Sequence, residues 1–179
     1  MNTQEKSTYT FSISEAIKYA QNDLIETWLT NFLSGIGNNP GLASGLRIEP
    51  RNYLGPVLVD LKTFNRCCGP EPEMKHHEPT GNFEARVKSI EQAIVSGYEM
   101  PPLLVNLEKG ALELTDGNHR YESLLRAGYT HYWTIFWETR RAEKPKAFED
   151  LITVHPAFND LEALKATQNE HSTFIKRLR

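Results

Sequence analysis

Apolar residues near the amino terminus recur at the intervals of an amphipathic helix. From Ile13 to Phe32 most are spaced three or four residues apart, which places them on one helical face. Ser12 and Glu15 have the spacing of a capping box, so the helix is expected to begin after Ser12. The Gly-, Asn- and Pro-rich segment 34–41 would end it. We therefore expect one long helix and a turn, as a helical extension over residues 1–45 that packs on the rest of the chain or on a partner.

The rest of the chain alternates between short apolar runs and helical patterns. Strands are predicted at residues 57–61, 103–107, 111–115 and 132–137. Helices are predicted at residues 83–96 and 121–127, each followed by a glycine, and one or two more are expected after Pro145. This order predicts an α/β (α+β) fold class, with a small mixed sheet and packed helices over residues 46–140 and a second helical extension over residues 141–179.

Composition and charge fit a globular chain and narrow its partners. The 179 residues are 39% apolar, and three Trp, seven Tyr and eight Phe supply large core side chains. Twenty basic residues face 23 acidic ones, a balance that disfavours nucleic acid, because binding to phosphates requires a basic surface. Cys67 and Cys68 are adjacent, so a disulfide between them would be strained. No signal peptide or membrane span is recognisable, which predicts a cytoplasmic protein without a membrane partner.

Residues 116–120, Asp-Gly-Asn-His-Arg, stand where a predicted strand turns directly into a predicted helix. The start of a helix exposes unpaired backbone N–H groups and the positive end of the helix dipole, which together favour an anion. Arg120 adds a guanidinium fork, and His119 adds a donor that can also carry a proton. Gly117 permits an unusual dihedral or a close approach. Three roles are open for Asp116: to cap the helix, to bind Mg²⁺ or to orient His119. The alternative is an ordinary strand–helix turn with surface basic residues.

The arrangement around this turn resembles the ParB/sulfiredoxin-like superfamily. Helix, Pro-Pro, strand, turn, strand, Asp-Gly-Asn-His-Arg-Tyr, short helix, Gly and strand follow in the same order, over roughly residues 55–138 and most clearly over residues 101–137. Members carry a Gly-x-His-Arg or Gly-x-Arg-Arg element here that grips nucleotide phosphates. The resemblance implies ATP, ADP or CTP as ligand, with phosphate contacts from His119, Arg120 and the backbone of Gly117 and Asn118.

The resemblance also implies further residues for the site. Sulfiredoxins place a basic residue and a hydroxyl three apart on the preceding helix, and Arg86 and Ser89 have that spacing here. The alternative for this pair is plain helix surface. Sulfiredoxins also need a cysteine directly before the His-Arg pair, where this chain has Asn118, so their redox chemistry is not expected. ParB proteins add a helix-turn-helix and a dimerisation segment, for which the residues after Trp137 are too few.

The free-serine kinases of the superfamily share Asp-Gly-x-His-Arg and fit best. In that branch a catalytic Glu lies in the loop after the first strand. The loop here, residues 65–82, offers Glu71, Glu73 and Glu78. Glu71 is the expected base, because its flanking prolines hold the backbone; a solvated acidic loop is the alternative.

These observations lead to three hypotheses about function. The first is a phosphotransferase (kinase) that uses ATP or ADP, or CTP, with Mg²⁺, on a small hydroxyl-bearing substrate; Glu71 acts as base, Asp116 binds Mg²⁺, and His119 and Arg120 hold the phosphates. The second is a nucleotide-sensing module whose terminal helix docks a partner or DNA. The third is a ParB-like nuclease. The N-terminal helix could line the acceptor pocket or form a homodimer interface.

Overall fold

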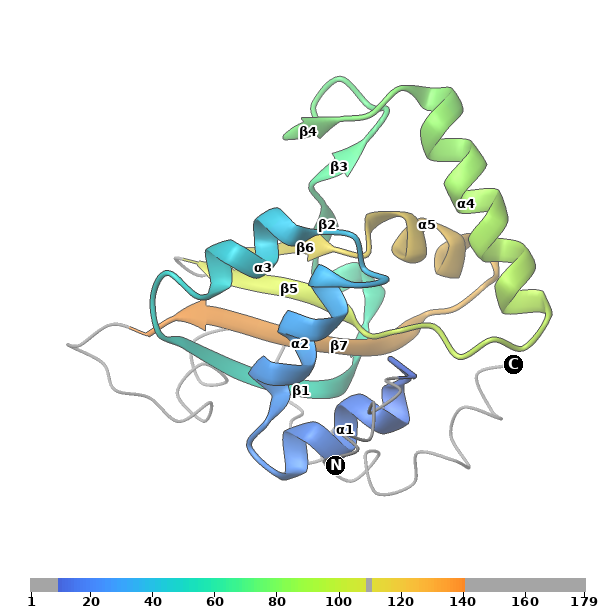
Figure 1. Ribbon diagram of the computed structural model, residues 1–179. Coiled ribbons are helices and arrows are strands. Elements are labelled where there is room, and N and C mark those ends of the chain that lie inside the picture. Colours follow the sequence, from blue (N-terminus) through green and yellow to red (C-terminus); the bar gives the residue numbers. More distant parts are fainter. Residues whose placement is uncertain (1–9, 109–110, 141–179) are drawn as a thin grey trace, which may run out of the picture.

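The computed structural model describes residues 10–108 and 111–140 (Figure 1). A mixed five-stranded sheet forms the centre, in the order β1-β7-β5-β6-β2. β1 runs antiparallel to β7, β7 parallel to β5, β5 antiparallel to β6, and β6 parallel to β2. The strands are β1 (Arg51–Asp60), β2 (Asn65–Arg66), β5 (Leu103–Glu108), β6 (Ala111–Asp116) and β7 (His131–Thr139). The predicted mixed α/β class is confirmed.

Helices and a small second sheet surround these strands. The helices are α1 (Ile13–Gln21), α2 (Ile25–Ser34), α3 (Pro40–Leu46), α4 (Thr80–Val95) and α5 (Asn118–Arg126), with one 3-10 turn, Leu61–Thr63. The predicted long loop contains β2 and a two-stranded parallel sheet of β3 (Cys68–Gly69) and β4 (His76–His77). None of the helices in the described ranges is long and apolar enough to cross a membrane.

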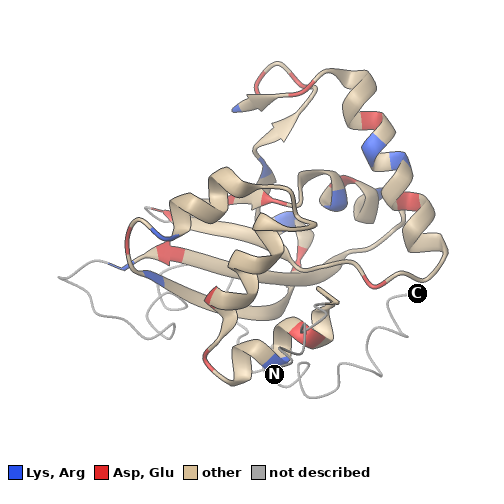
Figure 2. Cartoon of the chain, in the orientation of Figure 1, with Lys and Arg blue, Asp and Glu red and all other residues tan. Residues whose placement is uncertain are grey.

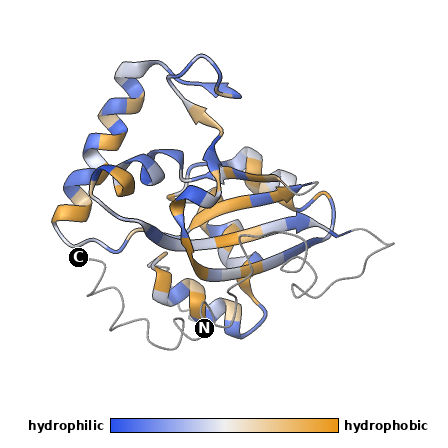
Figure 3. Cartoon of the chain, turned by 180° about the vertical axis from the view of Figure 1, so that it is seen from behind, coloured by the Kyte–Doolittle hydropathy of each residue, from blue (hydrophilic) through white to orange (hydrophobic). Residues whose placement is uncertain are grey.

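The sheet separates two apolar clusters, and its strands are correspondingly rich in hydrophobic residues (Figure 3). Leu104 belongs to the cluster that includes residues of α2 and α3, and Val105 belongs to the cluster on which residues of α4 and α5 pack, while α1 contributes to both. Successive residues of a strand point to opposite faces, so a single strand feeds both clusters. The N-terminal helices therefore pack on the sheet, which was one of the two uses expected for them.

The prediction of one continuous N-terminal helix is wrong. α1 begins at the expected capping box, where the Glu15 amide donates to Ser12 Oγ over 3.1 Å. It ends at Gln21, and Asp23 has a φ of 58°, in the left-handed region that Asn and Asp tolerate better than most residues. Asn22 Nδ2 donates to the Lys18 carbonyl over 2.7 Å, which competes with continuation of the helix. The break changes the direction of the chain, so that the axis of α2 differs from that of α1 (Figure 1).

The sequence did not predict α3. The helices predicted for the C-terminal part of the chain lie outside the residues that the structure describes. Pro40 was interpreted as part of a helix-ending turn, but it occupies the first turn of α3, where its missing N–H costs nothing. Asn39 caps this helix, with Oδ1 accepting from the Leu42 amide over 3.2 Å. The helices expected after Pro145, and with them the extension 141–179, lie outside the described residues.

Trp28 of α2 offers a test of whether the two apolar clusters unfold together. Trp28 is fully buried, stacks on Phe32 at 5.3 Å between ring centroids, and donates from Nε1 to Glu15 Oε2. We expect Trp28→Ala to lower the free energy of unfolding by about 3–5 kcal/mol in one cooperative transition, measured by urea denaturation followed by circular dichroism. Leu24→Ala, at a side chain that is 48% exposed, is the control and should stay within about 0.5 kcal/mol. A separate early transition in Trp28→Ala would contradict cooperative unfolding of the two clusters.

Candidate functional site

The turn from β6 into α5 has a backbone geometry that requires glycine. β6 ends at Asp116, and Gly117 is the N-cap of α5 with a φ of +97°. A Cβ at Gly117 would stand 2.8 Å from Nη2 of Arg120 and 2.8 Å from Cδ2 of Leu103. Both the positive φ and the close approach therefore exclude a larger residue.

The first amides of α5 are available to a ligand. The Tyr121 amide donates to the Gly117 carbonyl over 2.8 Å and closes the first turn. The amides of Asn118, His119 and Arg120 have no hydrogen-bond acceptor within the described residues. Three consecutive N–H groups and the positive end of the helix dipole are the elements of an anion site.

The side chain of Asn118 faces the protein and not the ligand. It is buried, and its Oδ1 accepts from the amides of Cys67 and Cys68, over 2.9 Å and 3.1 Å. Its Nδ2 donates to the Leu114 carbonyl over 3.4 Å. Asn118 thus holds the loop after β2 against α5, and only its backbone is left for the predicted phosphate contact.

Arg120 and Asp116 form a largely buried pair on the α2 side of the turn. Arg120 Nη2 donates to Asp116 Oδ2 over 2.8 Å, and Asn39 Nδ2 donates to Asp116 Oδ1 over 3.1 Å. The guanidinium lies 5.3 Å from the centroid of the Phe32 ring, and its Nε is buried without a hydrogen-bond partner among the described residues. Arg120 is therefore held in place, and its buried Nε–H is still unused among the described residues.

The contacts of Asp116 bear on the expected Mg²⁺ site. Each carboxylate oxygen already accepts a hydrogen bond, so the side chain serves as the partner of Arg120 and Asn39. The described part of the chain contains no group of three or more His, Cys, Asp or Glu placed to hold a metal ion. These residues do not fit a protein-held Mg²⁺, and the metal role of Asp116 stays a prediction without structural support.

His119 lies on the other side of the turn, against α4 and the loop before it. Its Nε2 is 2.7 Å from Oε2 of Glu78, and its ring centroid lies 4.9 Å from that of Phe83. The other carboxylate oxygen of Glu78 is 3.7 Å from Nε of Arg86, and Cys68 Sγ lies 3.8 Å from Oε2. The loop acid that reaches the His-Arg motif is therefore Glu78, which the sequence marked only as one of three candidates.

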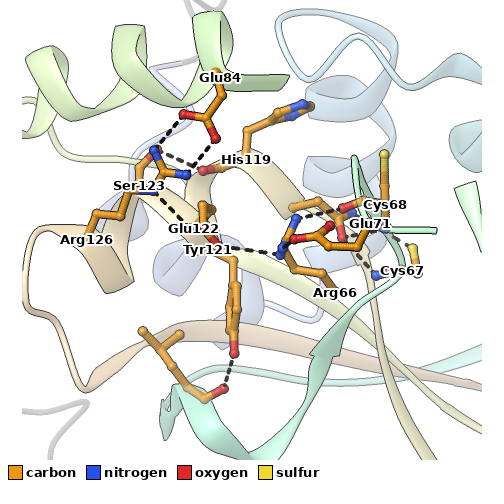
Figure 4. Close-up of polar contacts among 12 residues, drawn as sticks. Arg66, Cys67, Cys68, Glu71, Glu84, His119, Tyr121, Glu122, Ser123 and Arg126 are labelled. Atoms are coloured by element: carbon orange, nitrogen blue, oxygen red, sulfur yellow. Dashed lines mark hydrogen bonds and ion pairs between the residues drawn. The ribbon is translucent and has the colours of Figure 1, made fainter. Parts of the chain in front are cut away.

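Glu71, the expected base, has a different partner. Its carboxylate pairs with the guanidinium of Arg66, which also lies 3.6 Å from Glu122 and 4.8 Å from the Phe83 ring centroid (Figure 4). Burial raises the pKa of Glu71, but hydrogen bonds and the Arg66 charge outweigh it and lower the pKa below its ordinary value. A carboxylate with a lowered pKa is a weaker proton acceptor, so this pairing does not favour Glu71 as a base.

The two helix residues expected at the site differ in position. Arg86 is 64% exposed, and it extends toward Glu78 beside His119. Ser89 is exposed on α4, whose buried side is marked by Phe83 and Val87. Two basic residues lie between two acidic ones along this helix (Figure 2), and of the pair Arg86 and Ser89 only Arg86 has a contact on the His119 side of the turn. An ion pair between Arg126 and Glu84, at 2.7 Å, joins the exposed sides of α5 and α4 (Figure 4).

Removing the Asn118 amide should loosen the loop from α5. Asn118→Ala leaves two backbone N–H groups without their acceptor, and each unsatisfied buried donor costs about 1–3 kcal/mol. We expect a loss of about 2–4 kcal/mol in the free energy of unfolding, measured by chemical denaturation. Asn82→Ala, at an exposed position of α4, is the control and should change stability by less than about 0.5 kcal/mol. An equal effect of the two substitutions would refute the holding role of Asn118.

The thiol of Cys68 reports on Glu78. Burial raises the pKa of Cys68, and the neighbouring Glu78 carboxylate raises it further. Since the thiolate is the reactive form, alkylation should be slow near neutral pH and accelerate as pH rises through this raised pKa. Glu78→Gln removes the opposing charge, so we expect faster iodoacetamide labelling of Cys68 at pH 8, located by peptide mass spectrometry. Glu73→Gln, in the same loop but exposed, should leave the rate unchanged. No acceleration in Glu78→Gln would contradict this arrangement.

Comparison with known proteins assigns no family to this chain. No protein-family model matches the chain, and no curated protein matches its sequence. The likeness to the ParB/sulfiredoxin-like superfamily thus rests on the order of elements and on residues 116–120, and function is inferred from the site.

Proposed function

We propose that the chain binds the phosphates of a nucleotide at the turn 117–120 and transfers a phosphoryl group to a small hydroxyl-bearing molecule. The observation that supports this most is the run of three unpaired amides at the start of α5, opened by a glycine with positive φ. Anionic oxygens at this position would receive several N–H donors without any rearrangement of the backbone.

The basic side chains around the turn support phosphate as the anion. Arg120 carries a buried Nε that has no hydrogen-bond partner among the described residues. Arg86 is exposed, and its contact with Glu78 is long at 3.7 Å, so its guanidinium can turn toward a ligand. His119 packs on Phe83 of α4 and shares the Glu78 carboxylate with Arg86. Phosphoryl transfer depends mainly on such positioned positive charge.

The proposed reaction joins the hydroxyl oxygen of the acceptor to the terminal phosphorus of the nucleotide. The bond between that phosphorus and the bridging oxygen breaks, and the shortened nucleotide leaves with the electron pair. The hydroxyl proton must pass to a base. ATP and ADP are the expected donors, CTP is the alternative, and the resemblance of the motif to free-serine kinases supports a small hydroxyl compound as acceptor. We also propose a cytoplasmic location, which the two unpaired thiols support.

A nucleotide-sensing module is the second candidate, and one observation favours it. All three residues expected to act in catalysis are engaged in contacts within the protein: Glu71 with Arg66, Asp116 with Arg120 and Asn39, and His119 with Glu78 through Nε2. A sensor needs the phosphate-binding turn but no free base. In that case the nucleotide would bind and persist unchanged.

Nucleotide binding is tested by thermal shift with ATP, ADP, CTP, GTP and AMP, each with and without Mg²⁺. A nucleotide at 100 times its dissociation constant should stabilise the protein by about 2.7 kcal/mol, roughly 5–10 °C for a chain of this size. We expect this shift in the wild type and its loss in Arg120→Ala, each measured against the variant's own melting temperature.

Arg126→Ala is the matched control, because it removes an arginine from the opposite end of the same helix. It should keep the full shift. The absence of a shift with every nucleotide in the wild type would refute the proposed function. A shift without any loss of nucleotide on prolonged incubation with candidate alcohols would instead favour the sensor.

A further inference from the structure

His119 and Glu78 form a carboxylate–imidazole pair at the edge of the phosphate-binding turn. The Nε2···Oε2 distance of 2.7 Å is that of a strong hydrogen bond. A carboxylate oxygen can only accept, so the proton of this bond belongs to Nε2 of the imidazole. In the neutral ring the other nitrogen, Nδ1, then carries the lone pair.

Both members of the pair are held by their surroundings. The Glu78 amide donates to the Gly69 carbonyl over 2.9 Å, which fixes the backbone of the acid directly before α4. The ring of His119 packs on Phe83, which is buried. Both side chains are largely buried, Glu78 at 15% exposed and His119 at 19%. A ring held in this way keeps one orientation relative to the turn.

The second ring nitrogen is unused within the described residues. Nδ1 of His119 makes no hydrogen bond there, although its ring shares a turn with the three unpaired amides of α5. A phosphoryl group held by those amides would therefore have the imidazole as a close neighbour. Glu71, the other candidate base, is neutralised by Arg66.

We propose that Glu78 positions His119 as the proton acceptor of the transfer: it fixes the Nε2–H form and leaves Nδ1 to take the proton from the acceptor hydroxyl. This inference rests on the proposed function. As the hydroxyl oxygen bonds to the terminal phosphorus, the O–H proton passes to Nδ1, and the P–O bond to the nucleotide breaks. The resulting imidazolium is stabilised by the Glu78 carboxylate. His119 is the catalytic residue in this scheme, and Glu78 is a positioning residue.

The first test is a proton spectrum of the full chain without nucleotide. An imidazole N–H bonded to a carboxylate gives a resonance far downfield of the amides. We expect this resonance in the wild type and in Glu73→Gln, and its loss in both Glu78→Gln and His119→Gln. A wild-type spectrum without it, or a resonance that persists in Glu78→Gln, would overturn the pairing whether or not the protein binds nucleotides.

The second test measures transfer from ATP and ADP to glycerol and L-serine as hydroxyl probes. We expect Glu78→Gln to lower kcat by about 10²–10⁴-fold and to leave the nucleotide KM and the thermal shift unchanged. Glu78→Asp keeps an acceptor for Nε2 and should recover part of kcat, while Glu73→Gln should match the wild type.

The outcomes separate this inference from the proposed function. Wild-type binding and transfer with an undiminished kcat in Glu78→Gln would overturn the positioning role and leave the proposed function standing. Parallel losses of kcat and of nucleotide binding in Glu78→Gln would also overturn it, since they would assign Glu78 to ligand binding or folding. The absence of nucleotide binding in the wild type would refute the proposed function, and with it the catalytic role of the pair.

Discussion

One buried amide oxygen determines where the loop after β2 stands. Oδ1 of Asn118 accepts from two successive backbone N–H groups, those of Cys67 and Cys68, and so fastens the loop to the first residue of α5. The two residues that contact the His119 ring, Glu78 and Phe83, come from this loop and from the helix that follows it. The attachment at Asn118 therefore helps to fix the distance between Glu78 and the His-Arg motif. Asn118 thus contributes to the geometry of the motif through its side chain, which faces away from the predicted phosphate site.

The turn is supported from two sides by elements that are far apart in sequence. Arg120 is held by Asp116, Asn39 and Phe32, which ties it to α2 and the start of α3. His119 is held by Glu78 and Phe83, which ties it to the loop and α4. The two basic residues are neighbours in the chain, but their positions depend on opposite halves of the molecule. A ligand at the amides between them would contact a site whose two halves are held by different elements of the fold.

The repeating patterns of the chain predicted the fold class and most elements of the sheet, because period and turn residues are local properties. The break at residues 22–24 was missed, since an apolar stripe can continue in register across a short interruption. α3 was missed because Pro40 has the same appearance at a helix start as in a turn. At the site, the motif 116–120 was recognisable, but the partner of its histidine was not. Glu71 and Glu78 are equally acidic in sequence, and only the contacts of Arg66 and His119 distinguish them.

The two contacts of the Asn39 side chain require an uncharged amide. Its oxygen accepts from the Leu42 amide and its nitrogen donates to Asp116, so the two ends of one amide face partners of opposite kind. An aspartate of the same shape would still cap α3, and it would face the Asp116 carboxylate with a second negative charge. The amide also has only one workable orientation, because turning it over would present a donor to a donor and an acceptor to an acceptor. The direction of a single dipole therefore links the start of a helix near the amino terminus to the strand end where the turn begins, and an isosteric change of one atom would reverse the sign of that link.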